Sequence, residues 1–160
     1  MRILIFLLAF SAFAEVPVIE MKNAKALYVV DGDSISLSMR IKDIDTPEKK
    51  QNCRKTVDKI ISCGMVAKQH LQKLLNNLPG KLMIDPVGIG YYGRVLVDVY
   101  KGGINIGEIM VEDGIAYAFS PRYKPSERIA KKNKRGFWGY YKPPLNPKKW
   151  RKRYMRPLHK

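Results

Sequence analysis

Apolar and polar residues alternate in several short segments of the first hundred residues. Residues 26–30 form an apolar run that ends at a turn signal, Asp-Gly-Asp. In residues 95–99 the valines occupy every second position, which is typical of a strand. Residues 34–44 place Ile35, Leu37 and further apolar residues on one side and polar residues on the other. This last pattern fits either a half-buried strand or a very tight hairpin.

Helical spacing appears in three later segments. Apolar positions over residues 64–78 predict a helix, which Pro79-Gly80 ends. Asn105 is a suitable cap for a short second helix that stops at Gly114, and Ser126 for a third that ends before Gly136. Many short strands with interspersed helices predict an α+β fold, a small five-stranded β-barrel of the OB type with about three flanking helices.

The N-terminus has the pattern of a signal peptide over residues 1–14. A short basic start precedes an apolar run too short to span a bilayer, and Ala12-Phe13-Ala14 has the small-x-small form of a cleavage site. A buried first strand is the alternative. The expected product is an exported, periplasmic or secreted monomer without a membrane span. It consists of one domain over residues 15–139 and a basic extension over residues 140–160.

The charge is strongly biased, with 30 Lys and Arg against 14 Asp and Glu and a formal net charge of +16. No acidic residue follows Arg128. Such a bias indicates an acidic partner, which can be nucleic acid, an anionic membrane or a polysaccharide. General solubility would explain the same charge, so composition alone leaves the partner open.

Only two cysteines are present, Cys53 and Cys63. In an oxidising compartment an even pair favours a disulfide, and the alternative is two buried thiols. Two cysteines without a histidine cluster make a poor zinc site. His70 has no partner for nucleophilic catalysis, and the glycines around Gly90 form no dinucleotide fingerprint.

Three acids and two arginines have the chemistry that phosphodiester hydrolysis needs. Asp33 and Asp45 bracket one β segment, Glu48 follows at a turn, Arg40 lies between the two aspartates, and Arg94 opens a later strand. Carboxylates suit a hard cation, and a further carboxylate nearby can take a proton from water. Guanidinium groups hold phosphate oxygens through paired hydrogen bonds. Each residue alone is better explained as a turn residue or an exposed strand charge, and only their joint order favours the chemistry.

The order of five segments resembles the staphylococcal nuclease family. The segments are residues 30–34 (Val-Asp-Gly-Asp-Ser), 39–48 (Met-Arg-Ile-Lys-Asp-Ile-Asp-Thr-Pro-Glu), 92–96 (Tyr-Gly-Arg-Val-Leu), 104–116 and 130–138. The cysteine-bounded loop resembles exported members. The segment from Asp33 to Arg40 is shorter than in the best-known member, and Ser34 replaces a common threonine.

The resemblance implies a Ca²⁺-dependent nuclease that cuts DNA and RNA. Asp33 and Asp45 match the calcium-ligating carboxylates of the family, and Thr46 matches the residue that gives a carbonyl ligand. Glu48 matches the carboxylate that acts as general base. A catalytically inactive nuclease-like module that binds nucleic acid or an anionic surface is the alternative.

The resemblance also covers the phosphate and the base of the substrate. Arg40 and Arg94 match the arginines that contact the scissile phosphate, and Tyr92 matches an aromatic residue near the nucleotide, where packing is the other role. The lysine-rich end beyond Trp138 matches none of the five segments that carry the resemblance. Its pattern of aromatic and basic residues predicts a loosely packed tail that binds nucleic acid without taking part in the chemistry. Packing of the tail on the barrel is the alternative.

Overall fold

The structure is a computed structural model, and it describes residues 27–155. The predicted signal peptide, the start of the predicted domain and the last five residues lie outside the described residues. Within the described range, no helix combines the length and the apolar character that crossing a membrane requires.

The largest sheet is built around one strand. It contains β3 (Met39–Ile41), β7 (Leu82–Ile89), β8 (Val95–Lys101) and β9 (Ile104–Asn105). Strand β8 is the centre, because β3 pairs with it in parallel while β7 and β9 pair with it antiparallel. The valines of β8 are buried, as their alternation predicts. The parallel register sets Arg40 opposite Leu96, so the start of β8 lies beside β3.

The remaining described strands form three separate two-stranded sheets. The pairs are β1 (Leu27–Val29) with β2 (Ile35–Leu37), β4 (Ile44–Asp45) with β10 (Tyr117–Ala118), and β5 (Asn52–Arg54) with β6 (Ile60–Ser62). The pattern over residues 34–44 is thus neither one strand nor one hairpin. It is three short strands that pair with three different partners.

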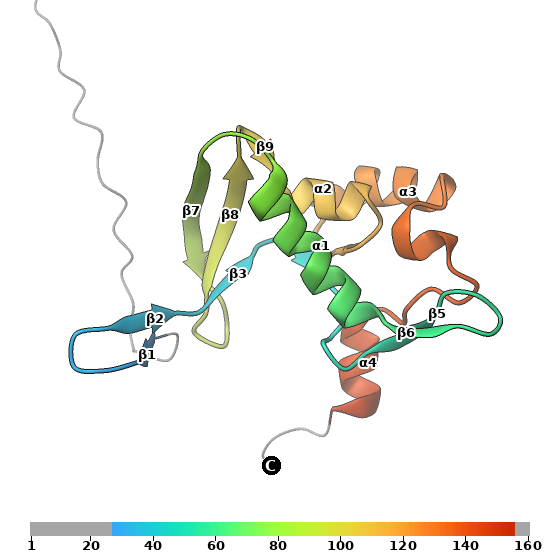
Figure 1. The fold of residues 1–160 in the computed structure, drawn as a ribbon, viewed down its shortest axis with the longest axis horizontal. Helices are drawn as coiled ribbons and strands as arrows, with labels where there is room; N and C mark the ends of the chain where they lie inside the picture. Colours follow the sequence, from blue (N-terminus) through green and yellow to red (C-terminus); the bar gives the residue numbers. More distant parts are fainter. Residues whose placement is uncertain (1–26, 156–160) are drawn as a thin grey trace, which may run out of the picture.

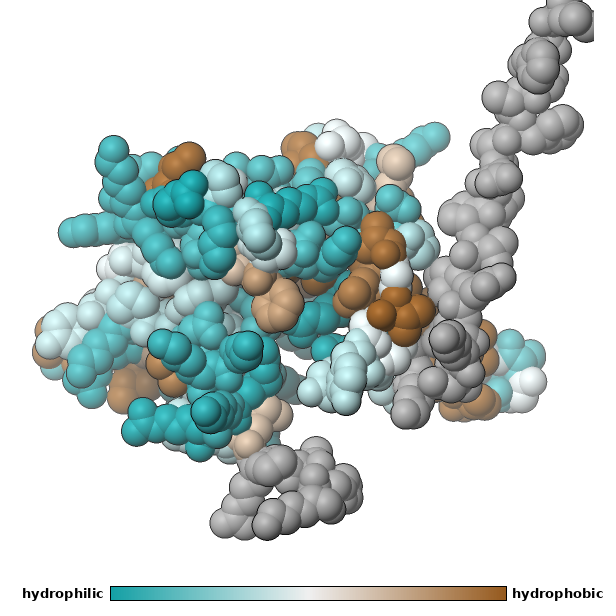
Figure 2. Space-filling view, turned by 180° about the vertical axis from the view of Figure 1, so that it is seen from behind, coloured by the Kyte–Doolittle hydropathy of each residue, from teal (hydrophilic) through white to brown (hydrophobic). Residues whose placement is uncertain are grey.

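The α+β class is therefore confirmed, but the described strands do not close a barrel. The β1–β2 hairpin pairs only with itself and lies at one end of the molecule, away from the helices (Figure 1). Apolar side chains of β1 and β7 remain exposed, among them Val29 and Met83. Figure 2 shows hydrophobic patches on the side of the molecule that carries these strands. Side chains that a closed barrel would bury are left at the surface here.

Within residues 27–155, four α-helices pack around this framework, where about three were expected. They are α1 (Cys63–Asn77), α2 (Ile106–Glu112), α3 (Lys124–Lys132) and α4 (Pro147–Tyr154). Asn105 caps α2 as predicted, by accepting a hydrogen bond from the Glu108 backbone amide. The predicted cap of the third helix is wrong. Helix α3 begins at Lys124, after a 3₁₀ turn that Ser120 caps.

The described part of the basic extension packs on the domain, which was the alternative to a loose tail. Asn146 caps α4 by accepting hydrogen bonds from two backbone amides, and Pro147 occupies the first helical position, where its missing amide hydrogen costs nothing. Pro147 is also buried. Upstream of the helix, the Pro144 carbonyl accepts a hydrogen bond from the Tyr117 hydroxyl. The start of α4 is therefore anchored to the core.

The core lies between β8, the helices and a 3₁₀ turn, Gly136–Gly139. Phe137, Ile106 and Met110 are its largest fully buried side chains. Filling this space with large apolar groups supplies the main driving force for folding.

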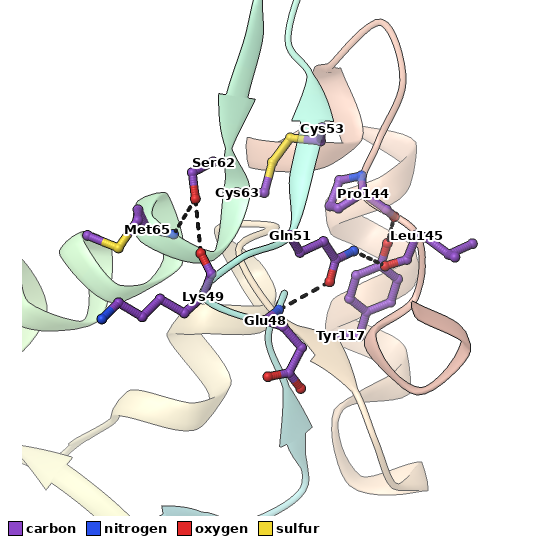
Figure 3. The surroundings of a disulfide bond; sticks show 10 residues. All are labelled: Glu48, Lys49, Gln51, Cys53, Ser62, Cys63, Met65, Tyr117, Pro144 and Leu145. Atoms are coloured by element: carbon purple, nitrogen blue, oxygen red, sulfur yellow. Dashed lines mark hydrogen bonds between the residues drawn. A yellow bond between two sulfur atoms is a disulfide. The ribbon is translucent and has the colours of Figure 1, made fainter. Parts of the chain in front are cut away.

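The disulfide between Cys53 and Cys63 joins β5 to the first residue of α1, with the two Cα atoms 5.9 Å apart. It confirms the predicted pairing. Figure 3 shows the bond beside the loop that carries Glu48 and Gln51. The Cys63 backbone amide donates to the Gln51 carbonyl at 2.9 Å, so the crosslinked hairpin also supports this loop.

Replacing both cysteines with serine is expected to lower the free energy of unfolding. A loop closed by residues 53 and 63 constrains the unfolded chain by roughly 2.5–3 kcal/mol in the chain-entropy model. Urea unfolding of the oxidised wild type, the reduced wild type and the double variant would measure this. The reduced wild type should match the variant, and an oxidised protein no more stable than either would contradict the expectation.

Candidate active site

Arg40 and Asp45 face each other across a tight turn. Strand β3 ends at Ile41 and β4 begins at Ile44, and Asp43 between them has a left-handed backbone (φ 64°) that aspartate tolerates better than most residues. The turn brings Arg40 Nη2 to 2.9 Å from Asp45 Oδ1 and 3.3 Å from the Ile44 carbonyl oxygen. The Asp45 side chain is only 5% exposed, so its charge depends on such partners.

The loop that carries Glu48 is held through the Glu48 backbone. Its amide donates to Gln51 Oε1 at 3.1 Å, and its carbonyl accepts from the Gln51 amide at 2.7 Å. Gln51 is fully buried and donates through Nε2 to the Leu145 carbonyl at 2.6 Å. Figure 3 shows the Glu48 carboxylate pointing away from Gln51 and the disulfide. The side chain is 30% exposed.

Gly64 allows α1 to approach the Glu48 backbone closely. A Cβ atom on Gly64 would lie 1.9 Å from the Glu48 carbonyl oxygen, a separation that no side chain can occupy. The first turn of α1 and the Glu48 loop therefore fit together only with glycine at position 64.

Changing Gly64 to alanine is expected to displace Glu48 and to reduce the nuclease activity that the resemblance implies. A displacement of about 1 Å can cost on the order of 10²-fold in rate, and the overpacking should destabilise the fold by about 1–3 kcal/mol. Steady-state kinetics and thermal unfolding would separate the two effects. Gln72→Ala, an exposed change on the same helix, is the control and should alter neither. Full activity in Gly64→Ala would show that the position of Glu48 is not critical.

A wide pocket of about 990 Å³ collects most of the predicted site residues. Its lining includes Arg40, Asp45, Thr46, Glu48, Tyr92 and Arg94. Arg94 precedes β8 and is half-buried, whereas Tyr92 is 75% exposed beside Tyr91. The pocket walls also carry Lys49, Lys68, Lys148 and Arg151, so six basic side chains face two carboxylates. Such an excess of positive charge attracts a polyanion.

Asp33 does not line this pocket. It lies in the exposed turn of the β1–β2 hairpin, where its carboxylate accepts a hydrogen bond from Ser34 Oγ at 3.0 Å. Its backbone amide donates to Asp31 Oδ1, and the pKa of Asp31 is lowered by hydrogen bonds with Ser34 and Asp33. The role of Asp33 as a metal ligand stays a prediction that this arrangement does not support.

Arg151 of α4 reaches into the site, which the sequence did not reveal. Its Nη1 donates to Glu48 Oε1 at 2.6 Å and to Asp45 Oδ1 at 3.1 Å, and its Nη2 donates to Asp45 Oδ2 at 2.7 Å. Hydrogen bonding to Asp45, and then to Glu48, raises the pKa of Arg151 and keeps it charged. A run of basic residues was the only signal for it, and such a run is usually a solvated helix face.

In this conformation the residues do not fit a calcium ion. Calcium takes six to eight oxygen ligands, usually including several carboxylates. The described residues contain no cluster of three or more metal-ligating side chains. Asp45 has both carboxylate oxygens on guanidinium groups, and Glu48 has one. Of the ligands that the resemblance implies, Asp33 is outside the pocket, and Asp45 is already bonded to two arginines.

Comparison with known proteins shows which family this chain is similar to. The family model described as staphylococcal nuclease homologue matches residues 38–140. An uncharacterized protein of Bacillus anthracis is 30% identical over 75% of this chain, which covers 62% of that relative. A micrococcal nuclease of Shigella flexneri is 28% identical over 81% of this chain and 80% of its own length. An uncharacterized endonuclease of Haemophilus influenzae is 27% identical over 83% and 75%. The chain belongs to the staphylococcal nuclease family.

Proposed function

We propose that this protein is a nuclease that hydrolyses phosphodiester bonds in DNA and RNA. The observation that carries the proposal is the gathering of Glu48, Arg40 and Arg94 in one basic pocket. The family supports the reaction class, and two of the similar proteins are named as a nuclease and an endonuclease.

Each of these side chains has a distinct part in the proposed reaction. Glu48 accepts a proton from a water molecule, whose oxygen then attacks the phosphorus atom. Arg40 and Arg94 donate hydrogen bonds to the non-bridging oxygens and stabilise the charge that builds up on the five-coordinate phosphorus. The bond to the leaving sugar oxygen then breaks, and that oxygen takes up a proton. Arg40 is held in place for this role by Asp45.

Substrate binding in this proposal uses the surroundings of the catalytic groups. The exposed rings of Tyr91 and Tyr92 offer faces on which an unpaired base can stack. Lys68 and Lys148 extend the positive charge along the pocket, where they can contact neighbouring phosphates.

We also propose that the enzyme requires calcium and works outside the cytoplasm. The family resemblance at Asp45 and Thr46 supports the calcium requirement, the signal-peptide pattern supports export, and no step above depends on either.

The alternative is a binding module without catalysis. Binding alone does not require a carboxylate and two arginines around one pocket, and this chain has all three. Digestion of plasmid DNA, single-stranded DNA and RNA, with calcium or with EDTA, tests the proposal. We expect cutting of each substrate with calcium only. Equal cutting with EDTA would remove the calcium requirement, and binding without any cutting would favour the alternative.

A further inference from the structure

We propose that Arg151 is a built-in plug that occupies the cation position of the active site. In the free protein its guanidinium group contacts Asp45 and Glu48, so a divalent cation must displace Arg151 before it can bind there. The inference rests on the proposed function, from which calcium is taken as the cation. Arg151 also lies beyond residues 38–140, the part of the chain that the family model matches.

The contact is far more specific than an ordinary surface ion pair. Two nitrogens of one guanidinium group make three hydrogen bonds to two carboxylates, at 2.6 to 3.1 Å. Exposed pairs contribute little because water competes for both partners, but the Asp45 side chain is only 5% exposed. Charge-assisted hydrogen bonds of this paired kind are among the strongest in proteins.

The position of Arg151 follows from the way α4 is anchored. Gln51 and Tyr117 bind the carbonyls of Leu145 and Pro144, and Pro147 is buried at the start of the helix. Arg151 follows Pro147 by four residues, so it lies on the same face of the helix one turn later. Beyond it, the helix ends in exposed residues. The fold thus fixes the base of α4 at the site while its far end stays at the surface.

A cation and the Arg151 guanidinium cannot share these oxygens. Both are positively charged, and both would bind Asp45 Oδ2, the oxygen that Arg151 Nη2 contacts in the free protein. On the Asp45 carboxylate, Arg40 contacts Oδ1 but not Oδ2, so departure of Arg151 would leave Oδ2 open to an ion and would release Glu48 for its proposed role as base. The contact therefore stabilises the metal-free form and weakens cation binding by the same free energy.

Calcium binding without nucleic acid tests the plug directly, by titration calorimetry on the full chain. Arg151→Gln removes the plug. Lys152→Gln removes the same charge from the neighbouring exposed position on α4 and serves as the control. We expect Arg151→Gln to lower the Kd for calcium by roughly ten- to a hundredfold, as the loss of charge-assisted hydrogen bonds implies. Lys152→Gln should stay within about twofold of wild type, and adding Asp45→Asn to Arg151→Gln should abolish the gain.

Each outcome bears on the proposal separately from the nuclease assay. Calcium affinity that is equal or lower in Arg151→Gln would overturn the plug, while cutting by the wild type would leave the proposed function intact. Absence of calcium binding in every variant would overturn both the plug and the calcium requirement. If Arg151→Gln does not fold, Arg151→Lys carries the test. It keeps the charge but loses the paired contact, so it should bind calcium more tightly than wild type, and equal affinity would contradict the plug.

Discussion

Glu48→Gln is expected to lower kcat by about 10²–10⁴-fold, the range that general-base catalysis typically contributes. The glutamine amide cannot accept a proton from water, although it has nearly the same shape. The backbone hydrogen bonds that join position 48 to Gln51 do not involve the side chain, so the fold should persist. Initial rates on single-stranded DNA, at matched concentrations of folded protein, would measure the loss.

Glu108→Gln is the matched control for this change. Glu108 lies on α2, outside the pocket lining, so the same neutralisation there should leave kcat unchanged. A Glu48→Gln enzyme with wild-type kcat would show that another group takes the proton, and it would remove Glu48 from the mechanism.

Arg94→Gln is expected to lower kcat/KM by about 10²–10³-fold, as for other donors positioned to stabilise transition-state charge. Arg94 is half-buried at the pocket wall and can meet a phosphate that enters beside Arg40. Kinetics with an oligonucleotide substrate would measure the effect. Arg128→Gln, an exposed change on α3 outside the pocket, tests whether loss of one positive charge suffices. Similar losses in both variants would mean that Arg94 acts only through general attraction.

Local spacing explains why part of the site is predictable. Arg40, Asp45 and Glu48 lie within nine residues of one another in the chain. The strand end, turn and short strand between them are too short to place them far apart. Arg94 is more distant, and it joins them only because β3 and β8 pair in parallel, a choice that alternation does not specify. The family resemblance supplied that long-range information, and the pocket agrees with it.

The positions of two residues could not be predicted from the sequence, for physical reasons. Asp33 lies in a motif that is typical of a ligand, but its hairpin pairs with no other described strand, and Asp33 lies outside the pocket lining. Arg151 is one of several basic residues in a run, and nothing in their order shows which one points inward. Its position depends on hydrogen bonds from Gln51 and Tyr117 to backbone carbonyls, which are contacts over long stretches of chain without a sequence signature.

The source of the oxygen in the products tests the central claim most directly. A single-stranded DNA oligonucleotide would be digested by the purified protein in ¹⁸O-labelled water, and the fragments would be weighed by mass spectrometry. Attack by a water molecule that Glu48 activates predicts one ¹⁸O atom in the terminal phosphate of each cleaved bond, and almost no fragments from Glu48→Gln. Intact oligonucleotide with the wild-type protein, or fragments whose phosphates carry no ¹⁸O, would contradict hydrolysis at this site.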